Sequence, residues 1–276
     1  MNRISKVVAV AIMIVILLTA VSIASPAGDK GNNKALIPGT MSPGTVIVFD
    51  ENCKIVVEEP LSKEEFEKAS KDLITLSKAE EEKLREEEKA VFAKAAEEAK
   101  SLPVYYVQES ELPAAEPGMT VYYDGMGLPT KIVNANGEIV AQESIYIEKD
   151  TSEQSVIING YAPIGTYIYG GNNNKITITS TSVTGEGLVT WYPGLGKIGD
   201  HDNILTVNDC ATKKQYDNPP SNTPVNIRNL QNNIASVCYK NDNGTLPNAI
   251  VDIMEPKMIN TFKATGRFSG RHYHLK

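Results

Sequence analysis

The chain has 276 residues and a mass of 30.0 kDa, and 41% of its residues are apolar, which is enough to form a hydrophobic core. Its 27 Lys and Arg stand against 34 Asp and Glu, so a formal charge of −7 gives no general attraction to nucleic acid. Three cysteines without a C-x-x-C pair, and three histidines, argue against a disulfide-dense scaffold and a metalloenzyme. We therefore expect no metal and no other cofactor.

Residues 1–24 have the pattern of an export signal. Arg3 and Lys6 precede a long apolar run that ends in the small residues Ser22-Ile23-Ala24, so cleavage is expected near Ser25. The run is also long enough to span a bilayer, so an uncleaved membrane anchor remains the alternative. In both cases the bulk of the chain lies outside the cytoplasm, either secreted or in the cell envelope. Membrane attachment would use only the uncleaved helix.

Two short hairpins are predicted after a linker. Residues 25–44 are rich in Gly, Pro, Asn and Ser and lack apolar periodicity, which is typical of a flexible linker. The β-branched segments 45–49 and 54–57, separated by a polar turn, predict a hairpin. A similar pair recurs at 121–124 and 131–133.

A charged helix is predicted over residues 62–100, within an α+β region that covers 45–150. The segment is dense in Glu, Lys and Ala, contains neither Gly nor Pro, and opens with the capping-box pair Ser62 and Glu65. Its apolar seam loses phase around 80–82, which argues against a coiled coil. The helix is either a solvated amphipathic helix or a docking surface for a protein partner.

From residue 103 onward the sequence predicts mostly β structure. Tyr, Val, Ile and Thr alternate with Gly, Asn and Pro clusters, and residues 167–179 read as strand, turn and strand. We assign 151–184 to a β-rich connection and 185–276 to a compact final domain.

Four motifs in this final domain occur in a recognisable order. They are Gly187-Leu188-Val189-Thr190-Trp191-Tyr192, Thr223-Pro224-Val225-Asn226-Ile227-Arg228-Asn229-Leu230, Lys240-Asn241-Asp242-Asn243-Gly244 and Ala249-Ile250-Val251-Asp252-Ile253. Together they resemble the barrel domain of the rare lipoprotein A family, which is related to expansins. The resemblance implies a six-stranded double-psi β-barrel behind the N-terminal helix and hairpins, and hence an α+β protein.

The same resemblance implies activity on peptidoglycan or another wall polysaccharide, in the manner of a lytic transglycosylase, a lyase. Asp252 matches the family's candidate acid, which would protonate the glycosidic oxygen before a muramyl hydroxyl closes an anhydro ring. A carboxylate inside the apolar strand 250–253 is costly unless it is paired or functional, and burial would raise its pKa. A purely structural aspartate is the alternative. The chain lacks the family's usual histidine before the second motif.

The final domain contains further candidate site residues besides Asp252. Asp242 matches the second carboxylate of the family, although an Asx-type turn residue is the alternative. Trp191, Tyr192 and Asn241 are candidate substrate-binding residues, since aromatic faces stack on sugar rings, but a lone Trp in a barrel also suits the core.

Cys210 and Cys238 both lie in the final domain, and in an oxidising exterior we expect them to form a disulfide, with two buried thiols as the alternative. Cys53 is then left over, either buried or paired between chains. His272 and His274 face the same side of a strand, but the rest of a metal site is missing, and we expect a solvated basic tail.

Three functions follow as hypotheses: a transglycosylase with Asp252 as acid, a non-catalytic glycan-binding or wall-loosening module, and an envelope scaffold that docks a partner through residues 62–100. The enzymatic hypothesis requires that Asp252 opens onto a solvent-filled cleft.

Overall fold

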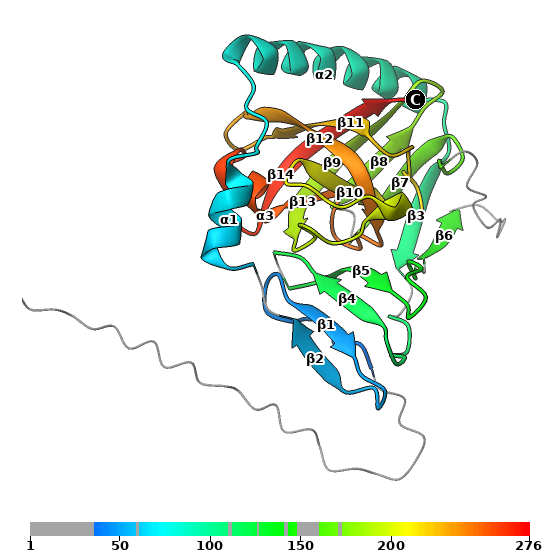
Figure 1. Ribbon diagram of the computed structural model, residues 1–276. Helices are drawn as coiled ribbons and strands as arrows, with labels where there is room; N and C mark the ends of the chain where they lie inside the picture. Colours follow the sequence, from blue (N-terminus) through cyan, green and yellow to red (C-terminus); the bar gives the residue numbers. More distant parts are fainter. Residues whose placement is uncertain are drawn as a thin grey trace, which may run out of the picture. The chain divides into compact units, whose positions relative to one another are not determined.

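The computed structural model describes residues 36–58, 61–109, 112–125, 127–140, 143–147, 160–170 and 173–276. Its main feature is a closed barrel of six strands near the C-terminus (Figure 1). The barrel strands are β9 (Ser182–Tyr192), β10 (Asp209–Lys213), β11 (Thr223–Asn229), β12 (Ala235–Gly244), β13 (Val251–Met254) and β14 (Arg267–Leu275).

The barrel closes because the last pairing joins the two ends of the strand order. The order is β13-β10-β12-β11-β14-β9, and β9 then pairs with β13. The pairs β10/β12 and β9/β13 are parallel and the others are antiparallel, so the barrel is mixed. Alternate residues of each strand point inward and build the core. That core includes Val189, Cys210, Val225, Cys238, Val251, Ile253 and Phe268.

The sheet continues beyond the barrel through the long strand β9. The first half of β9 pairs with β8 (Asn174–Ile178), which pairs with β7 (Gly165–Tyr169). This confirms the strand, turn and strand predicted over 167–179. Two further strands extend the edge, namely β3 (Val104–Glu109) and β6 (Glu143–Ile147). The barrel and these strands therefore share one sheet, and the predicted boundary at 185 falls within β9.

A second sheet of four strands lies in the N-terminal part. Its order is β2-β1-β4-β5, and its members are β1 (Val46–Phe49), β2 (Ile55–Glu58), β4 (Thr120–Tyr123) and β5 (Pro129–Val133). The register of β1 with β2, and of β4 with β5, confirms both predicted hairpins. This sheet has its own core, which includes Ile47, Phe49, Val121, Tyr123 and Ile132.

The predicted linker is wrong where the structure describes it. Ile37 is buried in the core of the second sheet, the Tyr123 hydroxyl donates to the Pro38 carbonyl over 2.8 Å, and the Gly44 amide donates to the Asp124 carbonyl over 2.9 Å. This segment is thus attached to the second sheet at Ile37, Pro38 and Gly44. The signal or anchor at 1–24 and the linker up to residue 35 lie outside the described residues.

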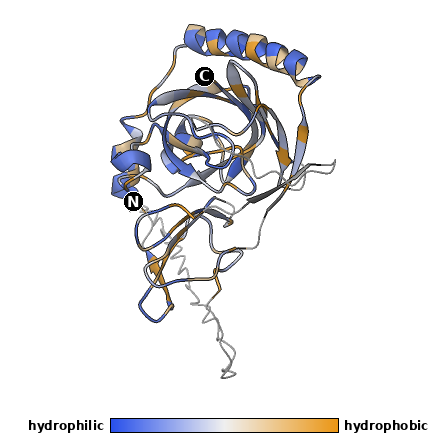
Figure 2. Ribbon diagram, turned by 90° about the vertical axis from the view of Figure 1, so that its right-hand side faces the viewer, coloured by the Kyte–Doolittle hydropathy of each residue, from blue (hydrophilic) through white to orange (hydrophobic). Residues whose placement is uncertain are grey.

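The single helix predicted over 62–100 is also wrong, because two helices occupy this segment: α1 (Lys63–Ser70) and α2 (Lys78–Ala99). Each begins with a capping box, Ser62 with Glu65 and Ser77 with Glu80. Helix α2 carries mostly hydrophilic residues, with scattered apolar ones (Figure 2).

Helix α2 lies on the barrel strands β9 and β12. It is fastened there by Glu88, whose carboxylate accepts two 2.7 Å hydrogen bonds from the guanidinium of Arg228 on β11. The helix surface that we considered for a protein partner therefore contacts the chain's own barrel.

Two short elements complete the fold, the 3-10 turn η1 (Asp200–Asp202) and helix α3 (Glu255–Asn260). Within the described ranges, none of the helices is both long enough and apolar enough to cross a bilayer.

Candidate functional site

Three polar residues and one alanine lie next to one another on four neighbouring strands of the barrel. In the strand register, Ala211 on β10 pairs with Asp242 on β12 and with Asp252 on β13. Asp252 in turn pairs with Thr190 on β9. We call these four residues the carboxylate row. Adjacent strands lie about 4.8 Å apart, so two strand steps place the backbones of the two aspartates about 10 Å apart, with only the small Ala211 between them.

The row faces away from the barrel core. Val251 and Ile253, which flank Asp252, both lie in the core, so alternation along the strand turns Asp252 outward. The same alternation applies to Thr190, because its neighbour Val189 is a core residue. The barrel itself therefore presents Asp252 at its surface.

Asp252 is nonetheless fully buried, so the expectation that it opens onto a solvent-filled cleft is wrong. The side chain that covers it is Thr130, from β5 of the second sheet. The hydroxyls of Thr130 and Thr190 both donate hydrogen bonds to the Asp252 carboxyl. In this arrangement a glycan cannot reach the carboxyl group.

The surroundings of Asp252 favour its protonated form. Burial is the main reason that its pKa lies well above the usual range, and the nearby charges of Asp124 and Asp242 raise it further, against the hydrogen bond from Thr130. Asp124 also comes from the second sheet, at the end of β4. A carboxyl group whose pKa is raised is better suited to donate a proton than an ordinary aspartate.

Asp242 is also buried, but it has a cationic partner. The Nζ of Lys131 on β5 lies 2.5 Å from Oδ1 of Asp242, and the Tyr192 hydroxyl donates to Oδ2 over 2.8 Å. Burial raises the pKa of Asp242 in spite of both contacts. The segment 241–244 belongs to strand β12, so the turn expected around Asp242 is not present.

Trp191 is held between two glycines of the N-terminal part. A Cβ atom at Gly44 or at Gly125 would clash with the indole ring, and the Gly125 amide donates to the Trp191 carbonyl over 2.9 Å. Trp191 is partly buried and packs against the barrel core. The indole of Trp191 thus packs between the barrel core and the N-terminal part.

Apart from the contact of Gly44, which precedes β1, these covering contacts come from one hairpin and its turn. We call strands β4 and β5, together with Asp124 and Gly125, the cap. Its backbone is also bonded to the barrel, because the Thr245 amide donates to the Thr130 carbonyl over 2.8 Å. The cap therefore occupies the surface that the sequence assigned to a glycan.

A solvent-filled cleft follows the seam between the second sheet and the barrel. It has a volume of about 1140 Å³, and Lys131 and Asn243 are among its lining residues, whereas Asp242 and Asp252 are not. Solvent thus reaches the cap side of the Lys131–Asp242 pair without reaching the carboxylates.

The other predicted site residues have structural contacts. The Asn241 amide donates to Asp209 over 2.8 Å and to Asn222 over 3.1 Å, and its side chain is buried. It therefore anchors loops. Tyr192 is buried in one apolar cluster with Ala211, and its hydroxyl donates to Asp242.

Cys210 and Cys238 do not form the expected disulfide in the structure. Both are free thiols that are buried in the barrel core. Burial raises the pKa of the Cys210 thiol well above its usual range. Cys53 is a free thiol that is partly buried, with Sγ 3.9 Å from the Ala115 carbonyl.

The expected solvated tail at His272 and His274 is wrong as well. Both rings are buried around Asp217, with His274 Nε2 at 2.7 Å from Oδ1 and His272 Nε2 at 3.4 Å from Oδ2. The composition of the tail does not reveal this, because the partner lies more than fifty positions earlier. In the described part of the chain, no group of three or more His, Cys, Asp and Glu side chains is placed to hold a metal ion.

Comparison with known proteins gives a relative that matches part of the chain. The chain is 40% identical over 82 residues to the uncharacterized protein YdjM of Bacillus subtilis (strain 168), a match that covers 29% of this chain and 63% of that protein. The chain thus spans less than two thirds of the length of this relative. No protein-family model matches the chain, and no solved structure matches it.

Proposed function

We propose that this chain is an exported envelope protein whose barrel, of the double-psi type found in the rare lipoprotein A family, cleaves glycan strands of peptidoglycan in the manner of a lytic transglycosylase. Asp252 is the general acid, and the structure represents a latent form in which the cap covers it. The export proposal rests on the targeting pattern of residues 1–24.

One observation carries the proposal. Asp252 is an outward-facing carboxyl group on the barrel, and it is buried because a separate sheet covers it. Asp252 accepts one hydrogen bond from Thr190 of its own barrel and one from Thr130 of the cap, so opening the cap would remove only the second. The raised pKa of Asp252 favours the protonated form that a general acid needs.

The reaction requires one proton donor. Asp252 donates its proton to the glycosidic oxygen as the bond from that oxygen to the anomeric carbon of the muramyl residue breaks. The C6 hydroxyl of the same residue attacks the anomeric carbon and closes the anhydro ring. Its proton passes to the Asp252 carboxylate, which restores the acid. No water is consumed, so no second carboxylate is needed to activate one, in contrast to hydrolysis.

The proposal is tested by opening the cap. In Gly125→Ala the added methyl group clashes with Trp191, whereas Gly39→Ala meets no atom within 4 Å and serves as the matched control. Each full-length variant is incubated with purified peptidoglycan, and the supernatant is analysed by mass spectrometry. We expect Gly125→Ala to release anhydro-muropeptides at least tenfold faster than the control, and Gly125→Ala/Asp252→Asn to release none.

A non-catalytic wall-binding module is the second candidate, and the complete burial of Asp252 favours it. In that case Gly125→Ala would sediment with insoluble peptidoglycan but release no soluble product. That outcome, or equal product from the Asp252→Asn double variant, would remove the assignment of Asp252 as acid.

A further inference from the structure

Strand β2 forms an open edge of the second sheet (Figure 1). The opposite edge, β5, is covered. Its Thr130 carbonyl accepts from the Thr245 amide of the barrel over 2.8 Å. Its Ile132 carbonyl accepts from the Val140 amide, also over 2.8 Å. In the described part of the chain, β2 pairs with β1 alone, so the outer side of β2, which we call the β2 edge, is open to another strand.

The β2 edge carries the backbone groups of Ile55 and Val57. On β1, the Phe49 carbonyl points away from β2, because it accepts from the Gly118 amide over 2.7 Å. Phe49 is the register partner of Ile55, so this pair is not hydrogen-bonded, and the alternation of antiparallel pairs extends the same arrangement to Val57. The N–H and C=O groups of Ile55 and Val57 thus point outward, and no backbone group among the described residues is bonded to them.

The side chains of β2 are apolar and exposed. Ile55, Val56 and Val57 are 42%, 50% and 59% exposed. Ile55 and Val57 pair in register with the core residues Phe49 and Ile47, so they extend the core face of the second sheet beyond its cover. Natural edge strands are usually protected by charged side chains or by proline, and residues 55–57 have neither. Such an edge favours the addition of another strand.

The sequence of β2 is complementary to itself in one antiparallel register. Within the strand, this register alone bonds the outer groups of both Ile55 and Val57 to a second copy, because each Ile55 lies opposite Val57 of the other copy. It places Val56 opposite Val56, and it places Lys54 opposite Glu58 at both ends. Opposite charges in such positions stabilise a strand pair. The β2 edge therefore fits a second copy of this chain.

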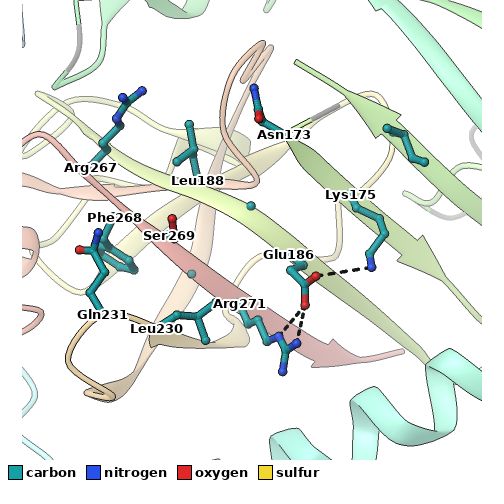
Figure 3. Close-up of a pocket in the computed structure, with 13 residues that line it drawn as sticks. Asn173, Lys175, Glu186, Leu188, Leu230, Gln231, Arg267, Phe268, Ser269 and Arg271 are labelled. Carbon is teal, nitrogen blue, oxygen red and sulfur yellow. Dashed lines mark hydrogen bonds and ion pairs between the residues drawn. The ribbon is translucent and has the colours of Figure 1, made fainter. Parts of the chain in front are cut away.

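The barrel already contains a charge pair of this kind. Glu186 on β9 and Arg271 on β14 are register partners on antiparallel strands, and Nη2 of Arg271 lies 2.6 Å from Oε2 of Glu186 (Figure 3). On β2, Oε2 of Glu58 lies 2.6 Å from Nζ of Lys197. A carboxylate has a second oxygen, so Glu58 can also accept from Lys54 of a second copy.

We propose that two copies of this chain form a dimer by antiparallel pairing of their β2 strands, with Val56 on the two-fold axis. The two second sheets then join into one continuous sheet. The assembly stops at two copies, because a two-fold interface uses the same strand of both. The inference goes beyond the proposed reaction and does not depend on it, since β2 belongs neither to the cap nor to the carboxylate row.

Cysteine substitutions test the register. Residues that face each other without backbone hydrogen bonds, such as Val56 with its copy, have Cα atoms about 4.5 Å apart, within the span of a disulfide. All variants carry Cys53→Ser, which leaves only the two buried native thiols. Under mild oxidation of the full chain, we expect Val56→Cys to form a linked dimer about tenfold faster than Val57→Cys, whose copy lies two residues further along the strand. Equal rates, or faster linkage of Val57→Cys, would contradict the register and the inference.

A lysine on the axis tests the interface itself. Val56→Lys places two like charges opposite each other, and we expect it to weaken dimerisation at least about tenfold. Leu275→Lys changes an apolar residue of β14 that is 64% exposed, and as the matched control it should leave dimerisation unchanged. Sedimentation velocity over a range of concentrations measures the dimer, and Trp191 emission shows that each variant is folded. A wild type that stays monomeric, or a dimer that persists in Val56→Lys, overturns the inference.

Charge reversal tests the pairing of Lys54 with Glu58. Lys54→Glu should weaken the dimer about tenfold, because it places two carboxylates opposite each other at both ends. Adding Glu58→Lys and Lys197→Glu restores opposite charges between the copies and keeps the pair inside each copy in reversed order. We expect this triple variant to dimerise as the wild type does. A triple variant that is no better than Lys54→Glu would show that the two residues do not meet.

Discussion

Lys131 and Asp242 form a buried ion pair between the cap and the barrel, with the Lys131 Nζ 2.5 Å from Oδ1 of Asp242. The side chains of Lys131 and Asp242 are 6% and 0% exposed, so water does not replace either partner in stabilising the charge of the other. The pair therefore links the position of the cap to the charge state of the carboxylate row.

Replacing one member of this pair should cost more than replacing both. We expect Lys131→Met to lower the free energy of unfolding by about 3 kcal/mol, because it leaves the Asp242 carboxylate buried and unpaired. The double variant Lys131→Met/Asp242→Asn should be more stable than Lys131→Met alone. Urea unfolding of the two single variants and the double variant measures the coupling, and purely additive effects would contradict it.

Asp252→Asn should stabilise the protein increasingly as pH rises. The folded pKa of Asp252 is raised, so its favourable contribution is complete below the ordinary carboxyl pKa and declines as pH rises toward the folded value. Over that interval the wild type should lose about 1.4 kcal/mol per pH unit relative to the variant. An amide can keep both contacts, because its oxygen accepts from one threonine hydroxyl while its nitrogen donates to the other. Urea unfolding at pH 4, 5.5 and 7 gives the difference, and a constant difference would show that the pKa is not raised.

Gly125→Ala should expose Trp191. This is the single tryptophan of the chain, and its indole is held against Gly44 and Gly125, so its emission reports the position of the cap. We expect a red shift of the emission maximum and stronger quenching by iodide in Gly125→Ala, with the spectrum of Gly39→Ala unchanged. Matching spectra for the two variants would mean that the cap tolerates the methyl group.

The buried pair of His274 and Asp217 should make stability depend on pH in two directions. Burial alone would lower the pKa of His274, but the charge and hydrogen bond of Asp217 outweigh it and raise the pKa. The contribution of His274 is thus complete below about pH 6.5 and is lost as pH rises through the higher folded pKa. The pKa of Asp217 is lowered, so its contribution is lost in acid, as pH falls below about 4.

His274→Gln isolates the first of these effects. Near pH 5.5 we expect the variant to be less stable than the wild type by about 2 kcal/mol, the usual scale for a hydrogen bond to a charged group. The deficit should shrink above pH 7. Thermal or urea unfolding from pH 5 to 9 measures it, and a deficit that grows with pH would reverse the assigned charge state.

The thiols give a chemical check on the barrel core. With all three cysteines free, alkylation of the unreduced, denatured protein should add three groups, whereas the native protein should react only at Cys53. Mass spectrometry counts the adducts. A single adduct after denaturation would restore the predicted Cys210–Cys238 disulfide.

Local sequence patterns predicted the strands well, but they did not predict that the cap covers Asp252. The alternation at 45–49 and 121–124 depends only on neighbouring residues, and both segments are strands. The break between α1 and α2 also had a local signal, the pair Ser77 and Glu80, which lies inside an otherwise helical composition. The segment between the two helices is also held by a distant residue, Asn208, whose side-chain oxygen accepts a hydrogen bond from the Ile74 amide over 2.9 Å. No local pattern predicts that contact.

The candidate site shows the same limit. A lone carboxylate among apolar residues identified the strand position of Asp252, but its exposure depends on Thr130, which is more than a hundred residues away in the sequence. Nothing in the segment around Thr130 and Lys131 distinguishes a cap from an ordinary hairpin. Contacts of such long sequence separation, rather than local preference, decide whether the carboxylate row is open.

The position of β14 in the barrel has a consequence for how the protein matures. This strand lies between β9 and β11 and pairs along its whole length with β9, which begins eighty-five residues earlier. Closure of the barrel must therefore wait until residue 275 has left the ribosome. Until then β9 and β11 have open edges that can pair with other chains, so a chaperone that shields nascent strands should raise the yield of native protein.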